Sequence, residues 1–143
     1  MLKAGFIGAG PRATSAHYPC IERLHDKVRL EAVCELDENR LAHVVEKYDI
    51  PQSFSDHRDM LELDLDVVYC VMHERWLLQP ALACLNAGRH ILIEKPPGAN
   101  SEETRQLLDA AVSNNVYAMV GFQRRFAAVT REAIRRVTAK GPV

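Results

Sequence analysis

Short apolar runs alternate with longer amphipathic stretches along this chain. The apolar runs are rich in β-branched residues, which is typical of buried strands. Several of the longer stretches follow a residue that favours a helix N-terminus, as Asp37, Asp56 and Asn100 do. Strands that alternate with helices of this length predict βαβ units. We therefore expect one domain of the α/β class, a doubly wound parallel sheet with helices on both faces.

The same pattern gives bounds for each element. Strands are expected at residues 3–8, 28–35, 51–55, 66–72, 89–93 and 116–122. Helices are expected at about 11–25, 38–48, 75–87, 101–114 and 127–139, with a brief helix after Asp56. Gly88 should end one of these helices, because glycine readily adopts the left-handed conformation found there. Asn100 and Glu103 have the spacing of a capping box at the start of another.

Composition places the chain among ordinary globular proteins. It has 143 residues, of which 48% are apolar and 26% charged, and its formal net charge is −1. This balance gives no reason to expect binding to nucleic acid or to a membrane surface. No apolar run approaches the roughly 20 residues of a membrane helix, and the N-terminus lacks the pattern of a signal peptide. We therefore expect a cytoplasmic protein.

Three further features favour structural roles. The four cysteines, Cys20, Cys34, Cys70 and Cys84, form no C-x-x-C pair, and we expect buried, reduced thiols. The histidines show no spacing typical of metal ligands, so no metal site is expected. Residues 124–140 carry six basic side chains against one glutamate. The apolar positions of this segment suggest packing on the sheet, and a solvated or interdomain face is favoured over contact with nucleic acid.

A glycine-rich turn follows the first expected strand. Gly8-Ala9-Gly10-Pro11-Arg12-Ala13 fits the pattern G-x-G-x-x-A at a strand-to-helix junction. The first glycine permits a tight turn, the second lets the backbone approach a pyrophosphate, and the small third residue allows the helix to pack closely. The helix N-terminus then offers free N–H groups to phosphate oxygens. The pattern predicts dinucleotide binding, with an ordinary βα turn as the alternative.

An acidic residue ends the second expected strand. Glu35 lies 27 residues after Gly8, where a carboxylate can accept hydrogen bonds from the ribose hydroxyls of NAD. The alternative is a solvated side chain at a strand end. We expect NAD to be preferred to NADP, because the negative charge of the 2′-phosphate of NADP would be repelled by this carboxylate. Arg40, which could neutralise such a phosphate, is expected to pair with Asp37.

A charged corner follows the fifth expected strand. In Glu94-Lys95-Pro96-Pro97-Gly98 the charges lie at the carboxyl end of a buried strand, where open α/β sheets bind ligands. Lys95 could donate a proton or polarise a carbonyl. Glu94 could hold this lysine or contact a ribose. An ordinary surface ion pair is the alternative.

These residues together resemble the Gfo/Idh/MocA oxidoreductases, a family that includes glucose–fructose oxidoreductase and inositol dehydrogenases. The resemblance is carried by the glycine turn, by Glu35, by the string from Ala87 to Pro96 and by Gly121-Phe122-Gln123-Arg124-Arg125-Phe126. It implies that residues 1–143 form an NAD(P)-binding Rossmann domain. It also implies a second, substrate-binding domain that this chain lacks, hydride transfer at a hydroxyl-bearing carbon of a sugar or polyol, and oligomer formation through the second domain.

The resemblance also implies roles for single residues. Gly8, Gly10, Pro11 and Arg12 would line the pyrophosphate turn, Glu35 the adenosine ribose, and Glu94 the nicotinamide ribose. Lys95 would be the catalytic group for proton transfer, and the peptide bond between Lys95 and Pro96 is expected to be cis. Gln123 and Arg124 would lie at the mouth of the cofactor site.

One stretch departs from the family pattern. Where the family commonly has T-P-N and a histidine shortly after, this chain has Met72-His73-Glu74-Arg75-Trp76-Leu77. Leu77 takes the usual place of the histidine. Met72 and His73 are retained as expected cofactor contacts, and for His73 a solvent-facing histidine at a strand end is the alternative.

Two other functions remain open at this point. The same fold can serve as a dinucleotide-binding sensor without catalysis, and a class I methyltransferase has a similar glycine turn. The corner at Glu94 and Lys95 argues against the methyltransferase.

Overall fold

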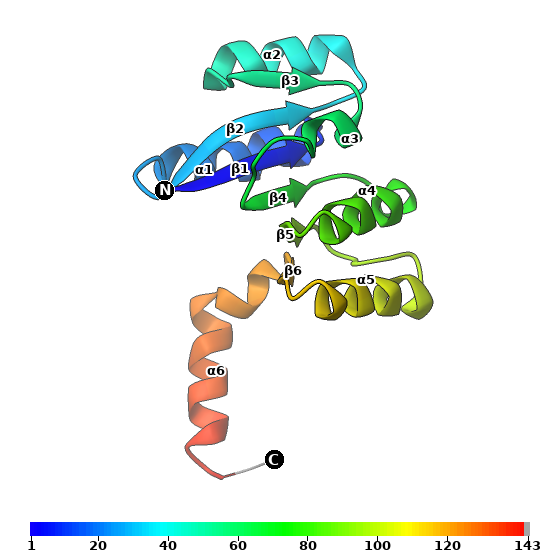
Figure 1. The fold of residues 1–143 in the computed structure, drawn as a ribbon. Coiled ribbons are helices and arrows are strands. Elements are labelled where there is room, and N and C mark those ends of the chain that lie inside the picture. Colours follow the sequence, from blue (N-terminus) through cyan, green and yellow to red (C-terminus); the bar gives the residue numbers. More distant parts are fainter. Residues whose placement is uncertain (142–143) are drawn as a thin grey trace.

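The structure is a computed structural model that describes residues 1–141. Its centre is a six-stranded parallel sheet in the order β3-β2-β1-β4-β5-β6 (Figure 1). The strands are β1 Leu2–Ile7, β2 Val28–Cys34, β3 Gln52–Phe54, β4 Val67–Cys70, β5 His90–Ile93 and β6 Ala118–Val120. The order reverses between β1 and β4, where doubly wound sheets bind ligands. The predicted fold class is confirmed.

Helices cover both faces of this sheet and create two cores. One core joins the strands to α3, α4 and α5, and the other joins them to η1, α1 and α2. In the second core Phe6 stacks between Tyr18 and Tyr69, with ring centroids 4.3 and 4.6 Å apart. The helices are η1 Ala13–His17, α1 Tyr18–Arg23, α2 Glu38–Tyr48, α3 His57–Met60, α4 Glu74–Asn86, α5 Ser101–Ser113, η2 Gln123–Phe126 and α6 Ala128–Thr138.

The expected helix caps are confirmed. Asp37, Asp56 and Asn100 each accept backbone N–H groups from the first turn that follows them. Gly88 has a φ of 74° beyond the end of α4. Because these polar side chains satisfy N–H groups that have no partner inside the helix, they fix where α2, α3 and α5 begin.

The first helical segment differs from the expected regular helix. It contains a π-helical turn, Ala13–His17, in which the N–H of Tyr18 donates to the carbonyl of Ala13, five residues before it. Pro19, the next residue, has no N–H, and its ring would collide with the carbonyl four residues earlier in an α-helix. The wider turn relieves this conflict. The helix also ends at Arg23, earlier than expected.

The basic C-terminal helix does not pack on the sheet, and this part of the prediction is wrong. Figure 1 shows α6 projecting away from the sheet, and none of its residues is buried. Val129 and Ile134 of its apolar side are exposed. The spacing of apolar residues therefore predicted the apolar side of α6 correctly, but it does not indicate which surface covers that side. An interdomain face stays a prediction.

The predicted burial of Cys20 is also wrong. Cys34, Cys70 and Cys84 are buried as expected, but Cys20 is exposed. It lies on the outer side of α1, whose inner side is occupied by Tyr18 and Ile21.

Within residues 1–141, no helix combines the length and the apolar character needed to cross a bilayer.

Arg89, just before β5, forms hydrogen bonds with the loop before β4. Its guanidinium donates to the backbone carbonyls of Leu65 and Leu63 at 2.9 and 3.0 Å. The side chain is largely covered, with 22% of its surface exposed. The Leu63 carbonyl also accepts the N–H of Leu65 at 3.0 Å, whereas the carbonyl of the buried Leu65 depends on Arg89 for its hydrogen bond.

We expect Arg89→Ala to lower the free energy of unfolding by about 2 kcal/mol, because a buried polar group left without its partner costs roughly 1–3 kcal/mol. Urea denaturation measures the effect. Arg29→Ala is the matched control, since Arg29 is exposed and pairs only with Glu31, and it should change stability by less than about 0.5 kcal/mol. Equal effects of the two substitutions would show that the carbonyl contacts do not stabilise the fold.

Candidate functional site

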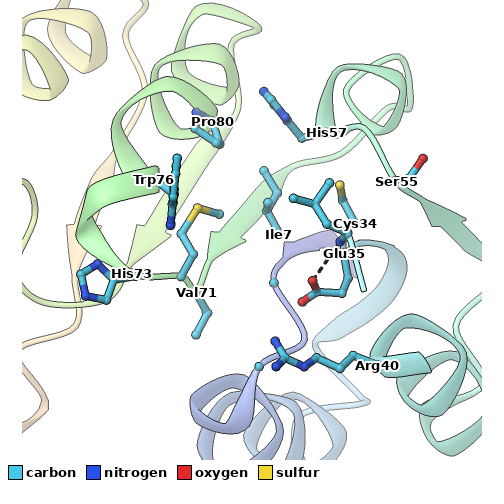
Figure 2. A pocket seen from close by; sticks show the side chains of 14 residues that line it. Ile7, Cys34, Glu35, Arg40, Ser55, His57, Val71, His73, Trp76 and Pro80 are labelled. Carbon is cyan, nitrogen blue, oxygen red and sulfur yellow. Dashed lines mark hydrogen bonds between the residues drawn. The ribbon is translucent and has the colours of Figure 1, made fainter. Parts of the chain in front are cut away.

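A cavity of about 580 Å³ lies at the carboxyl edge of the sheet, beside the ends of β1, β2 and β4 (Figure 2). It is lined by five of the predicted site residues, which come from three separate parts of the chain. These are Gly8, Gly10, Glu35, Met72 and His73. The parallel sheet brings them together because the strands that precede them all end at this edge.

The glycine turn forms one wall of the cavity. Gly8 has a φ of +109°, and a Cβ on it would collide with the carbonyl oxygen of Val71. Gly10 differs, because a Cβ there would meet no protein atom within 4 Å. Ala13 is fully buried against the sheet. The first glycine is thus required by the fold, whereas the space beside Gly10 is open to a ligand.

Glu35 is fixed by backbone N–H groups on the same side of the cavity. One carboxylate oxygen accepts from Ala9 at 2.7 Å, and the other accepts from Leu36 at 2.9 Å and from Asp37 at 3.1 Å. These bonds link the end of β2 to the glycine turn. Arg40 also lines the cavity and lies 3.6 Å from a carboxylate oxygen of Asp37. The predicted pair of Arg40 and Asp37 is therefore confirmed.

The opposite wall is formed by the end of β4 and the start of α4. Figure 2 shows His73 and Trp76 on this side, with Glu35 and Arg40 on the other side of the cavity. His73 caps α4, because its Nδ1 accepts the N–H of Arg75 at 3.2 Å. Trp76 is 69% exposed although it is large and apolar. Exposed aromatic surface in a cavity is typical of ligand-binding walls.

Leu77, which takes the family's histidine position, faces the core instead. Only 1% of its surface is exposed.

Cys34 reaches the cavity edge, where burial raises the pKa of its thiol to about 11. This thiol therefore stays protonated at neutral pH and is a poor nucleophile.

A second cluster surrounds Glu94, just beyond the end of β5. Its Oε1 accepts from Nε of Arg12 at 2.7 Å and contacts Nε2 of His17 at 2.8 Å. Its Oε2 accepts the N–H of Lys95 at 3.2 Å. Burial raises the pKa of the Glu94 carboxyl, but the hydrogen bonds from His17 and Arg12 outweigh burial and lower that pKa overall. The carboxylate is therefore ionised at neutral pH.

The remaining predicted residues lie outside the cavity. Lys95 is exposed, and its peptide bond to Pro96 is cis, as predicted. Pro11 is exposed at the start of the first helical segment. Gln123 and Arg124 lie in η2 and are exposed. The structure thus separates the predicted set into a cavity beside Glu35 and a cluster at Glu94.

His17 and Trp76 were not among the predicted site residues. In a regular α-helix, residues 12 and 17 point in different directions, and only the π-helical turn brings Arg12 and His17 to the same carboxylate. The signal in the sequence was Pro19, which disfavours a regular helix before it. For Trp76 the signal was its position: the single tryptophan of the chain lies in the first turn of the helix that follows β4, at the edge of the sheet where ligands bind.

Comparison with known proteins gives a consistent assignment. Residues 2–122 match the sequence model of the Gfo/Idh/MocA family, described as an oxidoreductase family with an NAD-binding Rossmann fold. D-glucoside 3-dehydrogenase of Escherichia coli is 31% identical over 140 residues, which cover 96% of this chain and 39% of that protein.

Two solved structures share the fold closely. The WlbA dehydrogenase of Chromobacterium violaceum, in complex with NADH and UDP-GlcNAcA, has a TM-score of 0.92 at 25% identity, covering 97% of this chain and 40% of the other. The scyllo-inositol dehydrogenase of Lactobacillus casei, with bound NAD(H) and scyllo-inositol, has a TM-score of 0.87 at 28% identity, covering 96% and 41%.

The chain therefore spans about 40% of the length of these relatives. The family match covers most of the chain and decides against the methyltransferase alternative. With its strand order, its glycine turn and its strand-end carboxylates, this chain belongs to the Gfo/Idh/MocA family of oxidoreductases, as an NAD-binding Rossmann domain.

Proposed function

We propose that this chain is the dinucleotide-binding domain of a longer dehydrogenase that acts on a hydroxyl-bearing carbon of a sugar or polyol. The observation that carries the proposal is the open space beside Gly10, enclosed by the glycine turn, by Glu35 and by the wall at Trp76. Relatives that act on a glucoside or are crystallised with an inositol support the substrate class. Oligomer formation through a second domain remains a prediction.

The residues present fit a dinucleotide. The first helical segment directs its N-terminus at the open space beside Gly10, and a helix N-terminus favours phosphate oxygens. Glu35 would accept hydrogen bonds from the adenosine ribose, and its three backbone donors hold it in place for that purpose. Bound NAD(H) would supply the hydride acceptor or donor.

The cluster at Glu94 would serve the nicotinamide half. Glu94 lies at the end of β5, and Lys95 follows it directly. Nζ of Lys95 would accept the hydroxyl proton when the substrate is oxidised, and would donate a proton to the carbonyl oxygen when the substrate is reduced, which is general acid–base chemistry. The cis peptide bond to Pro96 and the bond from the Lys95 N–H to Glu94 define the backbone on both sides of this lysine.

Trp76 offers a direct measurement of dinucleotide binding, because it is the only tryptophan of the chain and it lines the cavity. We expect titration with NADH to quench its fluorescence, since reduced nicotinamide absorbs where tryptophan emits. Gly10→Ala should fold normally, because its Cβ meets open space, but should bind NADH at least about tenfold more weakly. Unchanged fluorescence, together with no heat of binding in calorimetry, would contradict the proposed function.

A separate prediction concerns the choice between NAD and NADP. We expect NAD to bind at least about tenfold more tightly than NADP, because the 2′-phosphate of NADP would approach the carboxylate of Glu35. Two unit charges 4 Å apart repel by roughly 4 kcal/mol at an effective dielectric constant of about 20, before solvent and salt weaken the repulsion. Glu35→Gln should reduce this preference. Arg40→Ala should weaken NADP binding while leaving NAD binding nearly unchanged. Tighter binding of NADP by the native chain would identify Arg40 as the specificity residue.

A further prediction distinguishes an enzyme from a sensor. The 143-residue chain is expected to bind the dinucleotide without turnover, and the full-length protein to oxidise sugars or polyols. In the full-length protein, Lys95→Ala should lower kcat by about 10²- to 10⁴-fold and change NAD affinity little. A native full-length protein that binds NAD but turns over no substrate would favour the sensor, for which the buried leucine at position 77 is a specific argument.

A further inference from the structure

Glu94 is an unusual residue in this fold. Among residues 1–141 it is the one hydrophilic residue that is buried, with 8% of its surface exposed. A buried carboxylate is unfavourable unless hydrogen-bonding partners surround it. Its partners come from two distant segments, the π-helical turn and the chain just after β5. Such an arrangement holds the side chain in one orientation.

The protonation of the cluster follows from its geometry. An ionised carboxylate can only accept hydrogen bonds. Nε2 of His17, 2.8 Å from Oε1, must therefore carry a hydrogen and donate it. The charged and polar groups around this imidazole are Glu94, Arg12 beside it on the same oxygen, and Tyr69, whose ring it meets edge-on at 6.4 Å. His17 thus acts as a hydrogen-bond donor to Glu94.

The space around the second carboxylate oxygen is equally restricted. Oε2 accepts the N–H of Lys95, and a Cβ on Gly121 would lie 3.6 Å from it. The end of β6 therefore comes close to Glu94 as well. Rotation of the carboxylate would break bonds on both oxygens, so the donors at Oε1 also determine how Glu94 meets the backbone of Lys95.

The two donors at Oε1 differ in exposure. The side chain of Arg12 is 50% exposed and belongs to the glycine turn, whereas that of His17 is only 15% exposed. A dinucleotide pyrophosphate at this turn would compete with Glu94 for the guanidinium of Arg12, because both are anions that bind arginine well. His17 lies deeper and has no such competing partner from the ligand.

We propose that His17 is a positioning residue: it holds Glu94 in place for the nicotinamide half of the dinucleotide while Arg12 turns to the pyrophosphate. The proposal rests on the proposed function, since it requires a dinucleotide at this edge of the sheet. It assigns Arg12 to the two phosphates, which NAD and ADP share, and His17 to the nicotinamide half alone. A histidine that merely stabilised the helix would affect both halves equally.

The test is calorimetric titration of the 143-residue chain with NAD and with ADP, which carries both phosphates but lacks the nicotinamide ribose. His17→Ala should weaken NAD binding by about tenfold and leave ADP binding within about twofold. His17→Gln should restore NAD binding, because a glutamine amide places an N–H near the position of Nε2. Arg12→Ala should weaken both ligands. His25→Ala is the matched control, as His25 is exposed and contacts only the carbonyl of Glu22.

Each outcome decides between the alternatives. Equal weakening of NAD and ADP by His17→Ala, or no effect on either, overturns the positioning role. If His17→Ala fails to fold, His17→Asn, whose shorter amide falls short of Glu94, replaces it with the same expected result. A native chain that binds ADP and NAD normally while His17→Ala has no selective effect refutes this inference alone. A native chain that binds neither ligand refutes the proposed function and this inference with it.

Discussion

The candidate site depends on the close contact between Gly8 and the carbonyl of Val71. These residues follow β1 and β4, the two strands between which the order of the sheet reverses. Because Gly8 has no Cβ and adopts a positive φ, the turn after β1 can lie directly against the end of β4. Every other feature of the cavity follows from this placement. Glu35 reaches the N–H of Ala9, and the first helical segment starts beside the open space at Gly10.

Much of this arrangement could be predicted from the sequence because local chemistry determines it. Strand ends and helix starts coincide with capping residues such as Asp37 and Asn100, whose side chains act on the nearest N–H groups. The position of Glu35 follows in the same way, since the end of a parallel strand also defines an edge of the sheet. The family resemblance added the cis bond at Lys95 and Pro96, which periodicity cannot show.

The parts that could not be predicted depend on contacts between distant segments or on partners outside the chain. The apolar side of α6 is clear in the sequence, but nothing in residues 1–141 covers it. Cys20 was expected to be buried from residue type alone, whereas the packing of Tyr18 and Ile21 decided which side of α1 faces inward. The cluster at Glu94 required a π-helical turn, and helical periodicity assumes a regular helix.

The two carboxylates of the site illustrate two ways of holding an anion at a strand end. Glu35 is bound by backbone N–H groups, which cannot move away, and it remains partly exposed to a ligand. Glu94 is buried and is bound mainly by side chains, one of which, Arg12, is half exposed. A rigid carboxylate suits the recognition of a fixed group such as a ribose. A carboxylate held by side chains can exchange one partner for another as a ligand arrives, provided that a second donor stays in place. In this fold the second donor is His17, and the π-helical turn is what brings it within reach.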